Sequence, residues 1–72
     1  MTTTQRSKYK FTVKEYSDGT PWIAMEPLEK AIEFQNEGLL GLDLQKGMNV
    51  ERAREIAKYL NENVSGLSLT EF

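Results

Sequence analysis

A strict alternation of apolar and polar residues, followed by a turn sequence, constrains this chain more than any other feature. Between Lys8 and Val13 the apolar side chains fall on every second residue, which is the period of a half-buried strand. Ser17-Asp18-Gly19 follows, and a second apolar run extends from Trp22 to Met25. Two such runs with a glycine-containing turn between them predict a β-hairpin.

The register of this hairpin follows from the face that each residue would occupy. A three-residue loop, with Gly19 in the left-handed conformation, places apolar residues opposite one another on one face. In this register the cross-strand pairs are Val13 with Ile23, Phe11 with Met25, Lys10 with Glu26 and Lys14 with Trp22. A two-residue loop would instead place Glu26 across from Phe11 on the core face, which is costly. We therefore predict the three-residue loop.

The rest of the chain predicts two more strands and one long helix. Alternation with Gly41 and Asp43 indicates a third strand that has its leucines on the core: Leu40, Leu42 and Leu44. A helix is predicted over about 49–63, capped by Asn49, with the apolar stripe Val50, Ala53, Ile56, Ala57 and Leu60. Residues 67–70 alternate again, which indicates a short fourth strand. Residues 27–36 fit either a short helix or an irregular connection.

These elements follow one another as strand, strand, strand, helix, strand, and this order predicts an α+β fold. We expect two layers, with an antiparallel sheet of three to four strands and the long helix packed on one face. Residues 1–7 are expected to form a flexible N-terminal leader, and residues 8–72 a single small domain. A chain of 72 residues is too short for a separate catalytic domain and lid.

The absent residue types exclude several kinds of chemistry. The chain has no cysteine and no histidine, which removes thiol chemistry, thiolate metal sites and the commonest general base. Its serines have no histidine to activate them, and neither a phosphate-binding glycine loop nor an EF-hand spacing occurs. We therefore expect no enzyme, with no catalytic, cofactor-binding or metal-binding residues and no cofactor. No apolar run is long enough for a membrane span or a signal-peptide core, so we expect a cytoplasmic location and no membrane partner.

The hairpin face that points away from the helix carries the clearest interaction signal. In the register above, its basic and aromatic side chains are Lys10, Lys14, Tyr16 and Trp22. Tryptophan and tyrosine favour the centres of protein interfaces, and small domains without disulfides often gain stability by self-association. The Trp22 indole would be covered by lysine stems, by residues 27–36 or by another subunit. We interpret the chain as a non-catalytic domain that binds a protein partner or itself, as in a homodimer.

The same face supports an alternative function, binding of nucleic acid. Basic and aromatic side chains interleaved on a sheet are how single strands are bound. The first part of the chain is basic, with Arg6, Lys8, Lys10 and Lys14 before Glu15. However, the formal net charge is −2, whereas nucleic-acid-binding domains are typically basic. The alternative is a small nucleic-acid-binding module that uses the basic strand face.

Two stretches resemble HicB-like antitoxin domains. One matches their opening hairpin, with Tyr9, Val13-Lys14-Glu15, Asp18-Gly19, Trp22-Ile23-Ala24 and Pro27; the other is similar to their third-strand-to-helix junction, with Gly41 and Gly47-Met48-Asn49-Val50-Glu51-Arg52-Ala53. The similarity extends over residues 8–62, although the family has a shorter loop in place of residues 28–39. It implies a core that binds a protein partner and lacks catalysis. The chain also resembles short bacterial proteins built from one such hairpin and one helix.

Overall fold

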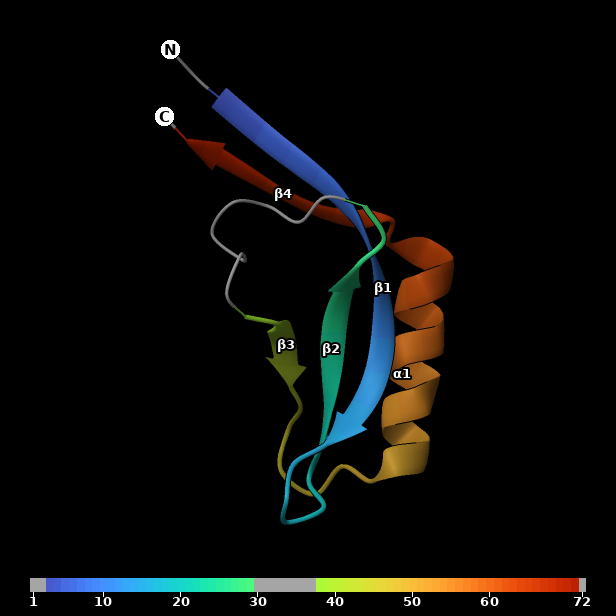
Figure 1. Ribbon diagram of the computed structural model, residues 1–72. Helices are drawn as coiled ribbons and strands as arrows, with labels where there is room; N and C mark the ends of the chain where they lie inside the picture. Colours follow the sequence, from blue (N-terminus) through green and yellow to red (C-terminus); the bar gives the residue numbers. More distant parts are fainter. Residues whose placement is uncertain (1–2, 30–37, 72) are drawn as a thin grey trace.

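A computed structural model describes residues 3–29 and 38–71, and it confirms the α+β fold (Figure 1). In chain order the elements are β1 (Thr3–Glu15), β2 (Pro21–Pro27), β3 (Leu40–Asp43), α1 (Val50–Asn63) and β4 (Gly66–Glu71). The four strands form one antiparallel sheet in the order β3-β2-β1-β4. The helix packs on one face of this sheet, against β1 and β2.

The hairpin between β1 and β2 has the predicted register. Phe11 lies opposite Met25, and Lys14 lies opposite Trp22. The Tyr16 N–H donates to the Thr20 carbonyl at 2.9 Å, which closes a three-residue loop. Gly19 has a φ of +86°, the left-handed conformation that the loop requires.

The flexible leader predicted for residues 1–7 is wrong for residues 3–7. These residues form the first part of β1, and they pair with β4 in the register Thr3 to Glu71 through Ser7 to Leu67. Residues 3–7 are polar and show no apolar alternation, so the sequence pattern did not predict a strand there. Together, residues 3–8 and β4 form a two-stranded arm that extends beyond the helix (Figure 1).

Pro21 and Pro27 of β2 lack an N–H group, but both occupy positions where no hydrogen bond to a neighbouring strand is lost. Hydrogen bonds from Tyr16 N–H to Thr20 and from Leu28 N–H to Lys8 bracket the hairpin. Because bonding alternates along an antiparallel pair, the backbone nitrogens of Pro21 and Pro27 point away from β1. On that side β3 pairs only with residues 22–25, so no ladder bond is lost.

The core lies between α1 and the β1–β2 pair. Its buried members are Tyr9, Phe11, Ile23, Met25, Ala53 and Ala57. The two helical alanines let α1 lie close to the sheet, and Asn49 caps the helix as predicted, by accepting from the Arg52 N–H at 2.8 Å.

The predicted burial of all three leucines on the third strand is wrong for Leu42. Leu40 and Leu44 pack against the core, whereas Leu42 is 38% exposed. Leu42 is exposed because it lies on β3, the edge strand of the sheet, whereas α1 packs against β1 and β2. A short helix and an irregular connection were both considered for residues 27–36. Of these residues, 30–36 lie outside the described part of the chain.

Candidate interaction surface

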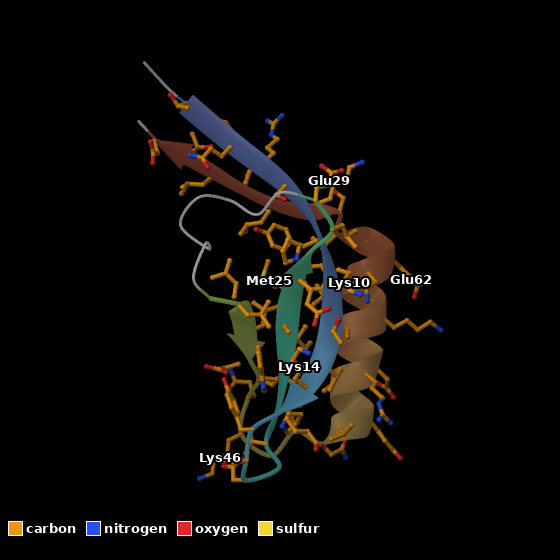
Figure 2. The ribbon with its side chains drawn as sticks, viewed as in Figure 1. Lys10, Lys14, Met25, Glu29, Lys46 and Glu62 are labelled. Atoms are coloured by element: carbon orange, nitrogen blue, oxygen red, sulfur yellow. The ribbon has the colours of Figure 1, made fainter. Side chains whose placement is uncertain are left out.

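The four predicted surface residues lie together on the sheet face opposite α1. Lys10 and Lys14, labelled in Figure 2, alternate with the core residues of β1, so both project from this face. Trp22 joins them from β2, where it lies opposite Lys14. Tyr16 follows directly after β1. We call this surface the outer face, and it comprises Lys10, Lys14, Tyr16, Trp22, Glu26 and Asp43.

Tyr16 and Trp22 form a stacked aromatic pair. Their ring centroids are 5.4 Å apart and their planes differ by 17°. Gly41 of β3 lies under the indole, where a Cβ would come within 2.5 Å of the ring atom Cε3. Trp22 is therefore half-buried by contacts within the chain. Tyr16 covers part of its indole ring, which the sequence did not predict.

The hydroxyl of Tyr16 fixes the position of this aromatic pair. It donates a hydrogen bond to Asp43 Oδ1 at 2.8 Å, which links the end of β1 to β3. The acceptor carboxylate raises the pKa of Tyr16 above its usual range, because the bond stabilises the protonated phenol. Tyr16 itself stays 48% exposed, so it is the more accessible member of the pair.

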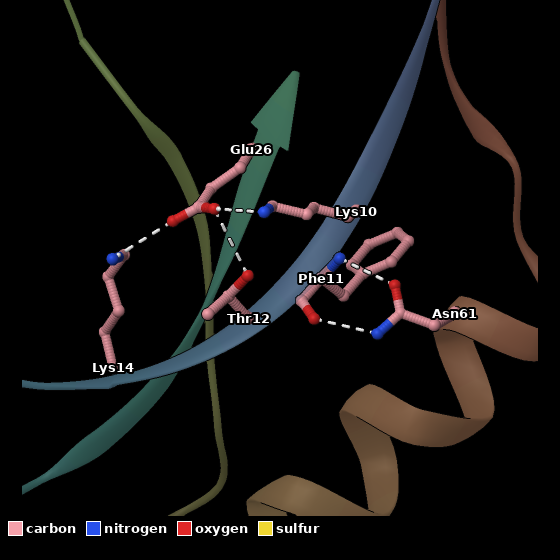
Figure 3. Close-up of polar contacts among 6 residues, drawn as sticks. All are labelled: Lys10, Phe11, Thr12, Lys14, Glu26 and Asn61. Atoms are coloured by element: carbon pink, nitrogen blue, oxygen red, sulfur yellow. Dashed lines mark hydrogen bonds and ion pairs between the residues drawn. The ribbon is translucent and has the colours of Figure 1, made fainter. Parts of the chain in front are cut away.

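Glu26 joins the two lysines of the outer face. One carboxylate oxygen lies 3.0 Å from Lys14 Nζ, and the other lies 3.6 Å from Lys10 Nζ (Figure 3). The Thr12 hydroxyl donates to the same carboxylate at 3.3 Å. Lys14, with a smaller contribution from Lys10, lowers the pKa of Glu26 below its usual range. One carboxylate therefore offsets part of the positive charge of two cations.

The remaining cations of the basic strand differ in their surroundings. Lys8 Nζ lies 4.0 Å from a carboxylate oxygen of Glu29, and both side chains are largely exposed. Arg6 is exposed on the arm and forms no ion pair within residues 3–29 and 38–71. Three of the four cations that suggested nucleic-acid binding are therefore in ion pairs with carboxylates.

Asn61 joins α1 to β1, a contact that the sequence pattern did not predict. Its side-chain amide accepts from the Phe11 N–H and donates to the Phe11 carbonyl, each at 2.8 Å (Figure 3). These are the two bonds that a residue of a neighbouring strand would form. Its place one turn after Ala57, on the flank of the buried stripe, is a signal that could have suggested a contact with the sheet.

The described residues contain few features that would support other chemistry. They hold no group of three or more carboxylates that could bind a metal ion. Within the same residues, no buried side-chain nitrogen or oxygen lacks a hydrogen-bond partner. In residues 3–29 and 38–71 no helix is both long and apolar enough to cross a membrane.

Comparison with protein-family models, with curated proteins and with solved structures gives no match. The resemblance to HicB-like domains therefore stays a prediction from the residues that carry it.

Proposed function

We propose that the chain is a non-catalytic protein-interaction domain that binds a protein partner, or a second copy of itself, through the outer face. The observation that supports this function is the stacked Tyr16–Trp22 pair beside the Lys10–Glu26–Lys14 cluster, on the side of the sheet opposite the helix. Aromatic side chains anchor interfaces, and charged groups around them set orientation and choice of partner.

The aromatic pair is ordered before any partner arrives. The stack on Trp22 and the bond to Asp43 hold the Tyr16 ring in place while leaving it 48% exposed. A side chain that is already ordered loses little conformational entropy on binding, so more of its contact energy appears as affinity. Tyr16 is therefore the anchor that we propose for the interface.

The test compares two exposed tyrosines on opposite sides of the molecule. Tyr16 lies on the outer face, and Tyr59 is 65% exposed on α1. We expect Tyr16→Ala to weaken association by about thirtyfold, which corresponds to about 2 kcal/mol, because a central aromatic anchor is lost. We expect Tyr59→Ala to leave association unchanged. Sedimentation velocity over a range of concentrations measures self-association, and calorimetry measures binding to a second protein.

Two partners are to be tested first. One is a second copy of the chain, and the other, suggested by the HicB-like resemblance, is any small toxin-like protein whose gene lies next to the gene for this chain. Equal effects of Tyr16→Ala and Tyr59→Ala on either complex would contradict the proposed surface. Urea unfolding of each variant separates a loss of binding from a loss of fold.

A nucleic-acid-binding module is the second candidate, and the exposed cations Arg6 and Lys8 beside Lys10 and Lys14 favour it. The ion pairs to Glu26 and Glu29 weigh against it, since they offset this charge. Phosphate binding would show as an affinity for single-stranded DNA or RNA that falls steeply with salt. We expect no binding at micromolar protein and low salt, and a salt-dependent affinity would favour this candidate instead.

A further inference from the structure

Three different groups bond the edge of β1 that faces away from β2. β4 pairs with residues 3–8, the Ser65 carbonyl accepts from the Tyr9 N–H at 3.1 Å, and the Asn61 amide bonds both backbone groups of Phe11. The next residue on this edge is Val13. No described residue bonds its backbone from that side.

Alternation along the strand identifies the open groups. Even-numbered residues of β1 bond to β2, as the Tyr16–Thr20 and Lys8–Leu28 bonds at either end show. The N–H and C=O groups of odd-numbered residues therefore face the other edge. Asn61 occupies the place of one strand residue beside Phe11, and the edge continues past it through Val13 to Glu15.

A groove of about 520 Å³ runs between this edge and α1. Apolar groups of Phe11, Val13 and Ala57 line it, and the helix contributes the cations Arg54 and Lys58, which are one turn apart, together with Glu62, so that the charged lining is basic by one unit. Neither cation forms an ion pair with a described residue; the helix ion pair that does form joins Arg52 and Glu55 at 2.8 Å. We call this feature the β1–α1 groove.

We propose that the β1–α1 groove binds an extended, acidic peptide segment of a partner protein, which adds to β1 as a short strand. The open backbone groups of Val13 supply the main-chain hydrogen bonds that strand addition uses. The apolar floor accepts alternate side chains, and Arg54 and Lys58 attract acidic ones. This site lies apart from the outer face and goes beyond the function proposed above.

The first experiment titrates the isotope-labelled protein with two synthetic probes and follows the amide resonances. Each probe is a peptide of about eight residues, one alternating valine with glutamate and the other alternating valine with lysine. We expect the glutamate probe to shift the Val13 and Glu15 amides and to bind at least about tenfold more tightly than the lysine probe. Methylating alternate backbone nitrogens of the glutamate probe should abolish its binding, because strand addition needs those N–H groups.

The second experiment uses matched charge reversals. Arg54→Glu with Lys58→Glu should weaken binding of the glutamate probe by at least about tenfold. The control, Arg6→Glu with Lys46→Glu, makes the same change in net charge at exposed residues outside the groove, and it should leave the affinity unchanged. Circular dichroism confirms that both variants fold.

Several results would overturn the proposal. They are equal binding of the two probes, equal weakening by the two charge reversals, shifts centred on β3 or the outer face, and no binding at millimolar probe. Tyr16→Ala lies outside the groove, so it should not alter probe binding. A failure of the groove therefore leaves the outer-face proposal standing, and a failure of the outer face leaves the groove standing.

Discussion

Gly19 is the single residue on which the hairpin loop most depends. Its φ of +86° is in the left-handed region, and nothing lies within 4 Å of the place a Cβ would occupy. Gly19→Val should therefore destabilise the fold through backbone strain alone, by more than about 1 kcal/mol. Gly38→Val is the control, because that glycine has equal space and no positive φ. Urea unfolding should show a change within about 0.5 kcal/mol for the control.

Glu26 gives the outer face a predictable dependence on pH. Its pKa lies below the ordinary value of 4.5, chiefly because of Lys14, so the folded protein binds its proton less readily than the unfolded chain does. The resulting stabilisation is present above about pH 4.5 and is lost as the pH falls through the lower folded value. We expect wild type to be more stable than Glu26→Gln at pH 6, with the difference shrinking as the pH falls below 4.5. Urea unfolding at each pH measures it, and a constant difference would contradict the ion-pair origin.

At this scale, the cross-strand pairs of the hairpin were predictable, whereas contacts that depend on side-chain rotamers or on the pairing of β3 were not. The period of two sets Lys10 opposite Glu26, and the structure confirms that pair. The diagonal reach of Glu26 to Lys14 depends on side-chain rotamers, for which the sequence carries no signal. The bond from Tyr16 to Asp43 depends on the pairing of β3 with β2, which joins residues far apart in the chain.

At the scale of elements, Asn61 ties α1 to the middle of β1. Asn61→Ala should leave the N–H and C=O of Phe11 without their partner and destabilise the fold by about 1–3 kcal/mol. Asn63→Ala is the matched control, since that amide bonds the exposed Tyr59 carbonyl of its own helix. Urea unfolding should show a change within about 0.5 kcal/mol for the control. Equal effects of the two changes would mean that the Asn61 bonds add little.

The elements differ in how far the sequence predicts them, for physical reasons. The hairpin and α1 were predictable because each has an apolar periodicity and a local signal at its boundary, Gly19 for the turn and Asn49 for the cap. In the arm, β4 was predicted from the alternation at residues 67–70, whereas the β1 half was missed because residues 3–7 carry no apolar pattern. The place of β3 at the sheet edge, which leaves Leu42 exposed, depends on strand order and not on local sequence.

At the scale of the whole molecule, β1 belongs to two structures at once. Residues 9–15 pair with β2 under the helix, and residues 3–8 pair with β4 in the arm. At about 3.3 Å per residue, the 13 residues of β1 span up to about 40 Å, which is most of the 43 Å long axis of the molecule. One strand therefore connects a part with a packed core to a two-stranded ribbon that contacts this core through the partly buried Leu67 and Leu69, and two-stranded ribbons are marginal on their own.

This division predicts that the arm opens before the body. The amides of Leu67 and Leu69 lie in the ribbon, whereas those of Trp22 and Ala24 lie in the hairpin beneath the core. Hydrogen exchange should be at least about tenfold faster in the ribbon, a difference of about 1.4 kcal/mol in opening free energy. Equal protection of the two sets would show that the molecule opens as one unit. Faster exchange in the ribbon would also bear on binding, because opening the arm frees residues 3–8 and lengthens the edge of β1 on which the β1–α1 groove lies.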